Sequence, residues 1–374
     1  MISSVRILQI NSARTFGGGE RHFADLANAL ATRGHEVYAA LTPASPLRTE
    51  LAQLPAAHVI TLPLRNALDV PSALALARFV REHRIEIIHA HVARDYPLAA
   101  LAARRARNAR LVITRHVPFP MSKLHRLALA NVARVIAVSA SVAQGLRAQK
   151  IFAPDKIRVV PNGIDLTRSA AVEREAARAE WRRRLHAPAS LLVGTVGDLS
   201  PVKGQDIFVR AAAHVCARGL NDVLFLIVGE DKSAKTRIRA QLEQLLATHK
   251  LAGRVRLLGR VDELAPFLAA LDVYVSASRA EAFGLALVEA MACGVPVVAT
   301  ATDGSRDIIE DGTTGRLVPI GAPEALADAL VALLNDADAR AMLGAHAHAA
   351  THARFGLARM VEETEQVYRE TMKE

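Results

Sequence analysis

Short apolar runs alternate with longer segments of helical spacing along nearly the whole chain, and this alternation restricts the fold more than any other feature. The short runs are rich in Val, Ile, Leu and Ala and have the length of buried strands. Strands that are each followed by a helix pair in parallel, and their helices cover both faces of the sheet. The sequence therefore predicts an α/β protein built from doubly wound, parallel sheets.

The alternation occurs twice. In the first half we expect strands at 5–10, 35–41, 58–62, 85–89, 110–114 and 135–138, helices at 20–33, 71–83 and 96–107, an apolar and basic stretch at 121–132, and a helix that Ser141 and Gln144 open as a capping box. In the second half we expect strands at 191–196, 223–228, 255–258, 272–276, 295–300 and 316–318, and helices at 206–217, 235–248, 285–293, 324–335, 337–352 and 355–370. Each half thus has enough strands for a sheet of its own.

The pattern restarts near residue 166, after a turn signal in which Pro161 precedes Asn162 and Gly163. A chain of 374 residues also exceeds the size of a typical single core. We therefore expect two Rossmann-like domains, residues 1–165 and 166–354. Ligands of such sheets bind at the carboxyl ends of the strands, so two domains that face each other would line one central cleft.

Composition excludes several classes of protein. No run of about 18 uncharged apolar residues is present, so we expect no membrane-spanning helix. The first residues lack the apolar core of a secretion signal. Cys216 and Cys293 lie in apolar helical patterns, where we expect reduced core residues and neither a disulfide nor a metal pair. These features indicate a cytoplasmic protein.

The net charge of +10 is distributed unevenly. Residues 1–165 contain 22 Lys and Arg against 10 Asp and Glu, whereas the rest contains 25 against 27. The excess indicates an anionic partner of the first half, such as a membrane surface, a phosphorylated glycolipid or a nucleic acid. An Arg-rich coding bias is the alternative. We do not expect nucleic acid, because helix-turn-helix, zinc-finger and aromatic stacking signals are missing.

The stretch that says most about function is 281–289, Glu-Ala-Phe-Gly-Leu-Ala-Leu-Val-Glu. It follows a predicted strand and opens a helix that Gly294 and Pro296 end, so Glu281 lies in a loop and Glu289 inside the helix. Free N–H groups at a helix start favour phosphate, and a carboxylate on the helix can reach hydroxyl groups beside it. Phosphate with hydroxyl groups suggests a nucleotide sugar. The alternative, ordinary surface glutamates, is weakened by the apolar helix that both flank.

In each half, the loop after the first strand contains a candidate ligand-binding residue. In the first, the run Gly17, Gly18 and Gly19 either makes a tight turn or brings backbone N–H groups against a ligand, and it does not complete a dinucleotide-binding fingerprint. In the second, Lys203 lies near the next helix start, where its charge could neutralise a diphosphate. Taken alone, Lys203 is better explained as a solvated side chain.

Histidines lie at the ends of two strands of the first half. His89 and His91 alternate along one strand, but no acidic or Cys ligand accompanies them, so we do not expect a metal pair. His116 is better placed, as a polar group that faces a ligand cleft. No Ser-His-Asp order, P-loop or His-Glu-x-x-His motif is present, which argues against hydrolases and nucleoside triphosphatases.

These motifs together resemble the family-four glycosyltransferases, which are retaining enzymes of the GT-B fold. The resemblance covers nearly the whole chain. It rests on 16–20 (Phe-Gly-Gly-Gly-Glu), 87–91 (Ile-Ile-His-Ala-His), 114–116 (Thr-Arg-His), 161–165 (Pro-Asn-Gly-Ile-Asp), 197–204, 281–289 and 292–300. The glutamate pair, with Phe-Gly inside it and Gly-Val-Pro after it, is the specific part of this set.

The resemblance implies that residues 166–354 bind a nucleotide sugar, that residues 1–165 bind the acceptor, and that the last helix, 355–374, packs back on the first domain. It implies that Glu289 hydrogen-bonds the ribose and that Glu281 lies beside the donor sugar. The further site residues that it implies are Lys203, Phe283, Gly284 and Leu285 at the diphosphate and sugar, Gly17 and Gly18 over the diphosphate and acceptor, His116 on the donor sugar, and Gly259, Arg260 and Val261 at the base.

One position departs from the family. Members often carry Arg directly after the glycine that matches position 197, and this chain has Asp198. The diphosphate therefore loses one of two cations unless Arg260, Arg279 or Arg306 replaces it. An Asp beside a diphosphate would be repulsive, so we expect Asp198 to point away or to meet a cation.

The reaction that the resemblance implies needs neither a metal ion nor a cofactor. Lys203 and the helix N-termini would stabilise the charge of the leaving diphosphate, which is usually the largest catalytic contribution. Glu281 would position and stabilise the sugar without acting as a covalent nucleophile. Domain closure would exclude water.

The expected function is retaining transfer of a hexosyl or N-acetylhexosaminyl group from a nucleotide sugar, with UDP as the family-based choice of nucleotide. Basic residues favour a membrane-associated acceptor, such as a lipopolysaccharide core or a lipid-linked oligosaccharide, and an enzyme that attaches peripherally to the inner face of the cytoplasmic membrane. They are Arg104, Arg105, Arg107, Arg110, Lys123 and Arg126. The alternatives are a soluble acceptor, a GT-B nucleotide-sugar epimerase, and a non-catalytic nucleotide-sugar-binding protein.

Overall fold

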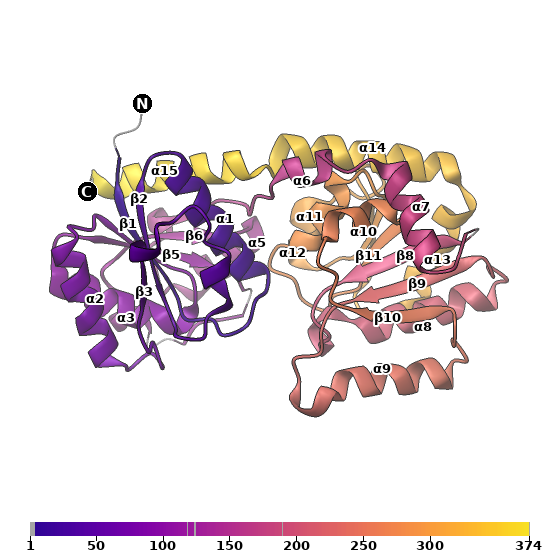
Figure 1. Cartoon of the computed structure of the whole chain (residues 1–374), viewed down its shortest axis with the longest axis horizontal. Coiled ribbons are helices and arrows are strands. Elements are labelled where there is room, and N and C mark those ends of the chain that lie inside the picture. The colour runs from indigo at the N-terminus through magenta and orange to yellow at the C-terminus, as the bar shows by residue number, and fades with distance from the viewer. Residues whose placement is uncertain (1–3, 118, 123–124, 189, 374) are drawn as a thin grey trace. The chain divides into compact units, whose positions relative to one another are not determined.

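The computed structural model describes residues 4–117, 119–122, 125–188 and 190–373, and the chain divides into two compact units. Unit 1 comprises Met1–Gly163 and Leu357–Glu374, and unit 2 comprises Ile164–Gly356. Each unit contains one parallel sheet with helices on both faces (Figure 1). The predicted fold class, an α/β protein with two doubly wound parallel sheets, is confirmed.

Unit 1 is built on a seven-stranded sheet in the order β3-β2-β1-β4-β5-β6-β7, in which all neighbours are parallel. Its strands are β1 (Arg6–Asn11), β2 (Glu36–Leu41), β3 (Val59–Thr61), β4 (Ile87–Ala90), β5 (Arg110–Arg115), β6 (Val132–Ala137) and β7 (Ile157–Val159). Its helices are α1 (Gly18–Thr32), α2 (Val70–Glu82), α3 (Tyr96–Ala106), α4 (His125–Ala128), α5 (Ala140–Gln149) and α15 (Leu357–Met372). The central strands are buried on both faces, which explains their continuous apolar runs.

The helix α15 completes the core of unit 1, although it lies at the far end of the sequence. Met360, Val361 and Tyr368 are buried in the same apolar cluster as Phe23 and Leu30 of α1. This burial removes a full apolar face of α15 from water, which is the main favourable contribution to its docking.

A buried carboxylate fixes the orientation of α15. Glu365 accepts two hydrogen bonds from the Arg33 guanidinium, at 2.7 and 3.0 Å, and lies 3.1 Å from Nε2 of His35. Burial by itself raises the pKa of Glu365, but the hydrogen bonds from Arg33 and His35 outweigh it and hold the pKa below its usual value. The carboxylate is therefore charged and paired at neutral pH.

Unit 2 is built on a six-stranded parallel sheet in the order β10-β9-β8-β11-β12-β13. Its strands are β8 (Leu191–Val196), β9 (Val223–Val228), β10 (Val255–Gly259), β11 (Val273–Ser276), β12 (Val297–Thr300) and β13 (Arg316–Val318). Its helices are α6 (Leu166–Ala170), α7 (Arg174–Arg184), α8 (Gln205–Ala217), α9 (Arg237–Thr248), α10 (Leu264–Ala270), α11 (Leu285–Ala292), α12 (Asp303–Ile308), α13 (Pro323–Asn335) and α14 (Ala337–Arg354). Among the described residues, no helix combines the length and the apolar composition that crossing a membrane requires.

Two local predictions are wrong. The cap of α5 is Ser139, whose Oγ accepts a hydrogen bond from the backbone N–H of Val142 at 3.2 Å, whereas Ser141 lies within the first turn. Helix α1 begins at Gly18, so the predicted glycine loop is shorter by two residues and only Gly17 precedes the helix, as its N-cap. In the stretch 121–132, the described residues form the short helix α4, and Lys123 lies outside the described residues.

Candidate functional site

A recess lies at the carboxyl ends of β8 and β11, the two strands between which the strand order of unit 2 reverses. Open α/β sheets bind their ligands at such reversal points. The recess is lined by Thr195, Val196, Lys203, Tyr274, Ser276, Ser278, Glu281, Gly284, Leu285, Ala286 and Leu287. Four residues predicted from the sequence are among them: Lys203, Glu281, Gly284 and Leu285.

An ion pair crosses this recess. Nζ of Lys203 lies 2.6 Å from Oε2 of Glu281, and the Ser278 hydroxyl donates to the same oxygen at 3.4 Å. The side chains of Lys203 and Glu281 are 34% and 16% exposed, so both remain reachable from solvent. The recess therefore holds a cation and a carboxylate that a ligand can separate.

The position of Lys203 follows from a close approach of two backbone segments. Lys203 ends the short 3₁₀ turn Pro201–Lys203, and Gly204 then opens α8 with a φ of +67°. A Cβ atom at position 204 would overlap the carbonyl oxygen of Ala277, which directly follows β11. Only glycine fits both the backbone conformation and the contact, and this contact holds Lys203 beside the end of β11.

Helix α11 presents its N-terminus to the same recess. Gly284 is its N-cap, with a φ of +112° that other residues rarely adopt. The loop before it is fixed from behind, because the backbone N–H of Gly304 donates to the carbonyl oxygen of Glu281 at 3.1 Å. Helix N-termini carry free N–H groups and a partial positive charge, so this end of α11 attracts an anion.

The two glutamates of the 281–289 stretch act on one buried group. Tyr274 of β11 is buried, which is the main reason that its pKa is raised, and the negative charges of Glu281 and Glu289 raise that pKa further. Glu289 is half-buried on α11 and does not line the recess itself. Phe283 points away from the recess, since its buried ring meets the Phe355 ring edge to face with centroids 5.5 Å apart.

Asp198 meets a cation, as predicted from the sequence. Its Oδ2 lies 2.8 Å from Nζ of Lys232, which follows β9 next to β8 in the sheet. The two side chains are 47% and 32% exposed. Lys232 is a cation at this edge of the sheet that no sequence motif marks.

The three arginines proposed as replacement cations lie elsewhere among the described residues. Arg279 makes two hydrogen bonds to Asp206, at 2.8 and 2.7 Å, and together they border a separate groove between α8 and α9. Arg260 and Arg306 are exposed, and neither lines the recess. The predicted base-binding residues Gly259, Arg260 and Val261 lie at and just past the end of β10, which β9 separates from β8.

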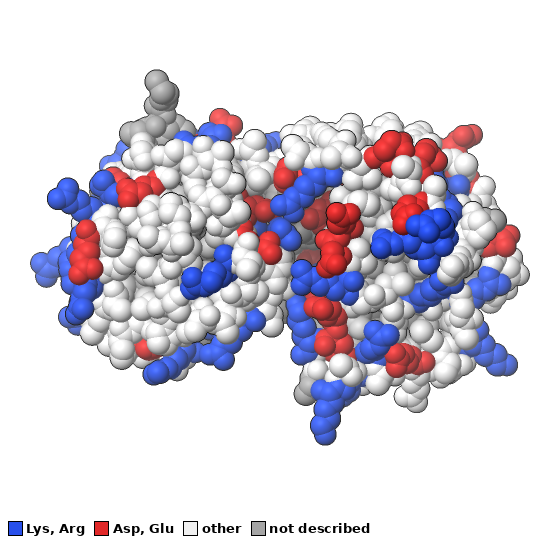
Figure 2. Space-filling view, viewed as in Figure 1, with Lys and Arg blue, Asp and Glu red and all other residues white. Residues whose placement is uncertain are grey.

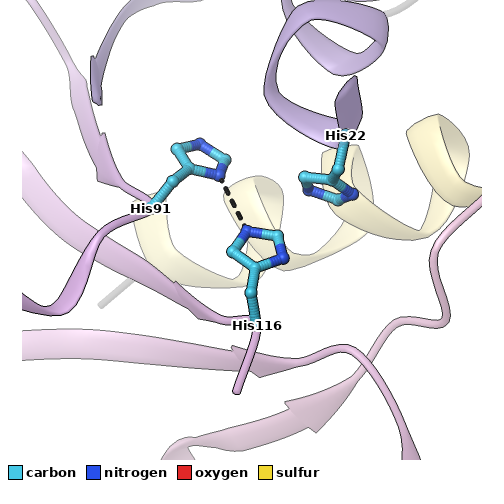
Figure 3. A group of neighbouring side chains, drawn as sticks. All are labelled: His22, His91 and His116. Atoms are coloured by element: carbon cyan, nitrogen blue, oxygen red, sulfur yellow. Dashed lines mark hydrogen bonds between the residues drawn. The ribbon is translucent and has the colours of Figure 1, made fainter. Parts of the chain in front are cut away.

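Unit 1 gathers histidines at its own reversal point, which lies between β1 and β4. His91 directly follows β4, His116 directly follows β5, and His22 comes from the start of α1 (Figure 3). Nδ1 of His91 lies 3.4 Å from Nε2 of His116, and one nitrogen of each of the three rings lies within 4.8 Å of the other two. His22 was not singled out from the sequence, because nothing links a helix residue to two strand ends.

His89 takes no part in this cluster. Its Nδ1 lies 2.6 Å from the Tyr368 hydroxyl and its Nε2 lies 2.7 Å from the Thr114 hydroxyl, so both nitrogens are engaged in the core. Neither ring nitrogen of His89 therefore faces the three-histidine cluster without a partner of its own.

His22 and His91 are buried, His116 is half-buried, and the three rings are uncharged at neutral pH. Burial is the main cause that lowers the pKa of His22 to about 4, while Asn162 acts weakly in the opposite direction. Burial, with the neighbouring rings, also lowers the pKa of His91 and His116 well below the usual value. Each ring therefore keeps an unprotonated nitrogen with a lone pair.

Two family models match the chain. "Glycosyl transferases group 1" matches residues 190–336, and "Glycosyltransferase Family 4" matches residues 16–168. Among solved structures, that of HepE of Anabaena in complex with UDP-glucose has a TM-score of 0.87 at 25% identity, covering 97% of this chain and 99% of that one.

Curated relatives include several glycosyltransferases. The D-inositol 3-phosphate glycosyltransferase of Xylanimonas cellulosilytica is 32% identical over 378 residues, covering 91% of this chain and 88% of that protein. The enzyme of the same name from Salinispora tropica is 36% identical over 231 residues, 59% of this chain, and the match spans about half of the relative, 47%. The lipopolysaccharide core biosynthesis glycosyltransferase LpsE of Rhizobium meliloti is 29% identical over 338 residues, covering 89% of this chain and 90% of that protein.

Proposed function

Because the chain belongs to the group 1, or family-four, glycosyltransferases of the GT-B fold, we propose that it transfers a hexosyl or N-acetylhexosaminyl group from a nucleotide sugar to a hydroxyl group of a membrane-associated glycan, with retention of configuration. Unit 2 holds the donor and unit 1 the acceptor. The observation that carries the proposal is the Lys203–Glu281 ion pair beside the N-terminus of α11. Together they offer a cation, backbone donors and a carboxylate within one recess.

The diphosphate of the donor is bound by the N-terminus of α11 and by Lys203. When a phosphate oxygen binds Lys203, it replaces Glu281 as the partner of the lysine. Glu281 then becomes free to accept a hydrogen bond from the sugar. Glu289 holds the ribose, and the residues after β10 hold the base. We propose UDP as the nucleotide, and the UDP-glucose complex of HepE supports this choice.

Transfer breaks the bond between the anomeric carbon and the diphosphate and forms a bond to the acceptor oxygen on the same face of the sugar. The proton of the acceptor passes to the leaving phosphate. Lys203 and the backbone N–H groups of α11 stabilise the charge that develops on the diphosphate. Lys232, held by Asp198, supplies the second cation. In unit 1, Gly17 and Gly18 serve the acceptor.

The proposed acceptor surface is the outer side of α3 and α4. Residues 101–150 contain ten Lys and Arg and no Asp or Glu. Arg104 donates to the backbone oxygens of α4, beside the exposed side chain of Leu127, and Phe119 in the preceding loop is also exposed. On the face that Figure 2 shows, unit 1 carries more Lys and Arg than Asp and Glu, whereas unit 2 mixes both signs. Apolar side chains among basic ones are typical of surfaces that lie on anionic lipid.

A donor screen tests the reaction. UDP-, GDP- and ADP-sugars are compared by thermal shift, because only a ligand of the folded state raises the melting temperature. We expect UDP-sugars to stabilise the protein and the released product to keep the anomeric configuration of the donor. Epimerised donor would identify an epimerase, and binding without transfer or slow hydrolysis would identify a non-catalytic protein. Stabilisation by none of the sugars would contradict the proposal.

Liposome flotation tests the acceptor class. The protein should float with anionic vesicles more than with neutral ones, and the double substitution of Phe119 and Leu127 by Ser should weaken its binding to the anionic vesicles. Met342→Ser, which removes a similarly exposed apolar side chain from α14, is the matched control. Equal partitioning to both vesicles would favour the second candidate, a soluble polyol phosphate acceptor, for which the D-inositol 3-phosphate glycosyltransferases are the observation.

A further inference from the structure

We propose that His22, His91 and His116 form a binding site for one divalent transition-metal ion of the zinc class, which ties the start of α1 to the ends of β4 and β5. The site goes beyond the proposed function and does not depend on it.

The distances suit a tetrahedral site. Zn–N bonds of about 2.0–2.1 Å place two ligand nitrogens about 3.4 Å apart in a tetrahedron. Nδ1 of His91 and Nε2 of His116 already lie 3.4 Å apart. The ligand nitrogen of His22 lies within 4.8 Å of both. Three imidazoles with a fourth, open position is a common zinc ligand set.

Gln9 orients the His91 ring as an outer partner would. Oε1 of Gln9 lies 2.8 Å from Nε2 of His91. A carbonyl oxygen can only accept, so Nε2 carries the proton and Nδ1 presents its lone pair to the cluster. Metal-binding histidines almost always donate their second ring N–H in this way. Phe23 meets the same ring edge to face, with centroids 5.1 Å apart, and further restricts it.

His22 supplies the independent observation. The residue is 2% exposed, and neither ring nitrogen makes a hydrogen bond of good geometry, although the Asn162 side chain lies close enough to raise the pKa of the ring. Burying a polar group without a partner is unfavourable. An ion bound between the rings would give one of these nitrogens its partner. Oδ1 of Asn162 and Nε2 of Gln9, which lie beside His22 and His91, are also buried without a partner and could meet a water on the ion.

The place of the cluster in the fold also favours a ligand. The three rings lie at the carboxyl edge of the first sheet, next to its reversal point, where open α/β sheets bind their ligands. Their distance from one another in the sequence explains why no metal motif is visible: His22 lies on a helix, and the other two follow different strands. Only the fold brings them together.

Cobalt titration tests the site. Tag-free full-length protein is dialysed against chelator and titrated with Co²⁺, whose visible absorption is intense only in tetrahedral coordination. We expect one equivalent of Co²⁺ to give this absorption, Zn²⁺ to displace it, and Zn²⁺ to raise the melting temperature of the wild type. His22→Asn, His91→Asn and His116→Asn should each weaken binding by about 100-fold, and Gln9→Leu by about tenfold, since outer partners typically contribute 10–100-fold.

The double substitution of His348 and His352 by Asn is the matched control, because these two exposed rings of α14 stack with centroids 4.1 Å apart and could bind Co²⁺ adventitiously. It should leave the absorption unchanged. Circular dichroism checks that every variant is folded. The proposal is overturned if the wild-type protein titrated with Co²⁺ gives no tetrahedral absorption. This test does not depend on any variant. It is also overturned if the control abolishes binding while the three single variants retain it.

Discussion

Nζ of Lys203 and Oε2 of Glu281 lie 2.6 Å apart across the recess of unit 2. The two residues are 78 positions apart in the sequence, and they meet because the start of α8 touches the end of β11 at Gly204. Each charge is neutralised by the other until an anion arrives. Under the proposed function, donor binding would exchange these partners: phosphate would bind the lysine and the sugar would bind the carboxylate.

Lys203→Met should lower kcat/KM by about 10²–10³-fold, the loss expected when one group that stabilises a developing negative charge is removed. The melting temperature should change little, because partly exposed ion pairs contribute only about 0–1 kcal/mol to stability. Arg239→Met is the control, since it breaks an exposed pair of 2.9 Å with Glu243 on α9. Full activity of Lys203→Met would show that Lys203 does not contribute to catalysis.

Glu281→Gln should separate binding from chemistry. The substitution frees Lys203 from its competing partner, so affinity for UDP should stay the same or rise, by at most about fivefold for a pair that contributes up to about 1 kcal/mol. Transfer should fall strongly, because the sugar loses its carboxylate. Calorimetry with UDP and initial rates with the sugar donor measure the two effects. Parallel loss of both would indicate a structural role instead.

Lys232→Met should weaken UDP binding by about tenfold, because a hydrogen bond to a charged group contributes about 1.5–3 kcal/mol. Asp198→Asn should not weaken it, since that change removes an anion and leaves the lysine in place. Lys235→Met, an exposed lysine three residues further along, is the matched control. Titration calorimetry at two salt concentrations distinguishes a direct contact from general charge. Equal effects at 232 and 235 would argue against a specific phosphate contact.

Gly204→Ala should destabilise unit 2 at least twice as much as Gly253→Ala. Both glycines have positive φ, +67° and +78°, so both variants bear the cost of the left-handed backbone, about 1–2 kcal/mol. A Cβ atom at 253 meets no other atom within 4 Å, whereas one at 204 overlaps the oxygen of Ala277. Urea unfolding measures the free energy of unfolding of both variants, and the difference between them isolates the cost of the close approach between position 204 and Ala277. Equal stabilities of the two variants would mean that the backbone at the α8–β11 contact shifts to accommodate the added Cβ atom.

Glu365→Gln should destabilise unit 1 by about 2 kcal/mol at pH 7, since it removes a buried hydrogen-bonded charge. The folded-state pKa of Glu365 is depressed, so its contribution is present above the unfolded pKa, near 4.5, and is lost as the pH falls through the folded value. The stability difference between wild type and variant should therefore shrink between pH 6 and pH 3.5. Urea unfolding at both values measures it, and a constant difference would exclude a role for the charge.

Much of the fold could be predicted, because buried parallel strands leave continuous apolar runs in the sequence. The strands predicted at 191–196, 223–228 and 316–318 match β8, β9 and β13 residue for residue. Helix ends were less predictable: the cap of α5 lies two residues before the predicted Ser141, since both Ser139 and Ser141 can cap and only the backbone path decides between them.

The candidate site is visible in the sequence chiefly where its residues lie close together. The 281–289 stretch carries the loop, the helix start and both carboxylates, so its chemistry is visible before folding. The pairing of Lys203 with Glu281 and of Asp198 with Lys232 depends on which strands become neighbours, and the cluster around His22 depends on three separate elements. Such contacts are properties of the sheet order and not of any local pattern.

The return of α15 to unit 1 has a consequence for synthesis. Unit 2 is one continuous segment and can fold as soon as it has been made, whereas unit 1 lacks the helix that buries Phe23 and gives His89 its partner Tyr368 until the ribosome has passed through unit 2. At about 5–20 residues per second this delay is about 10–40 seconds. Unit 1 thus begins to emerge before unit 2 and is finished after it, and during that interval the docking site of α15 is an exposed apolar surface that chaperones can recognise.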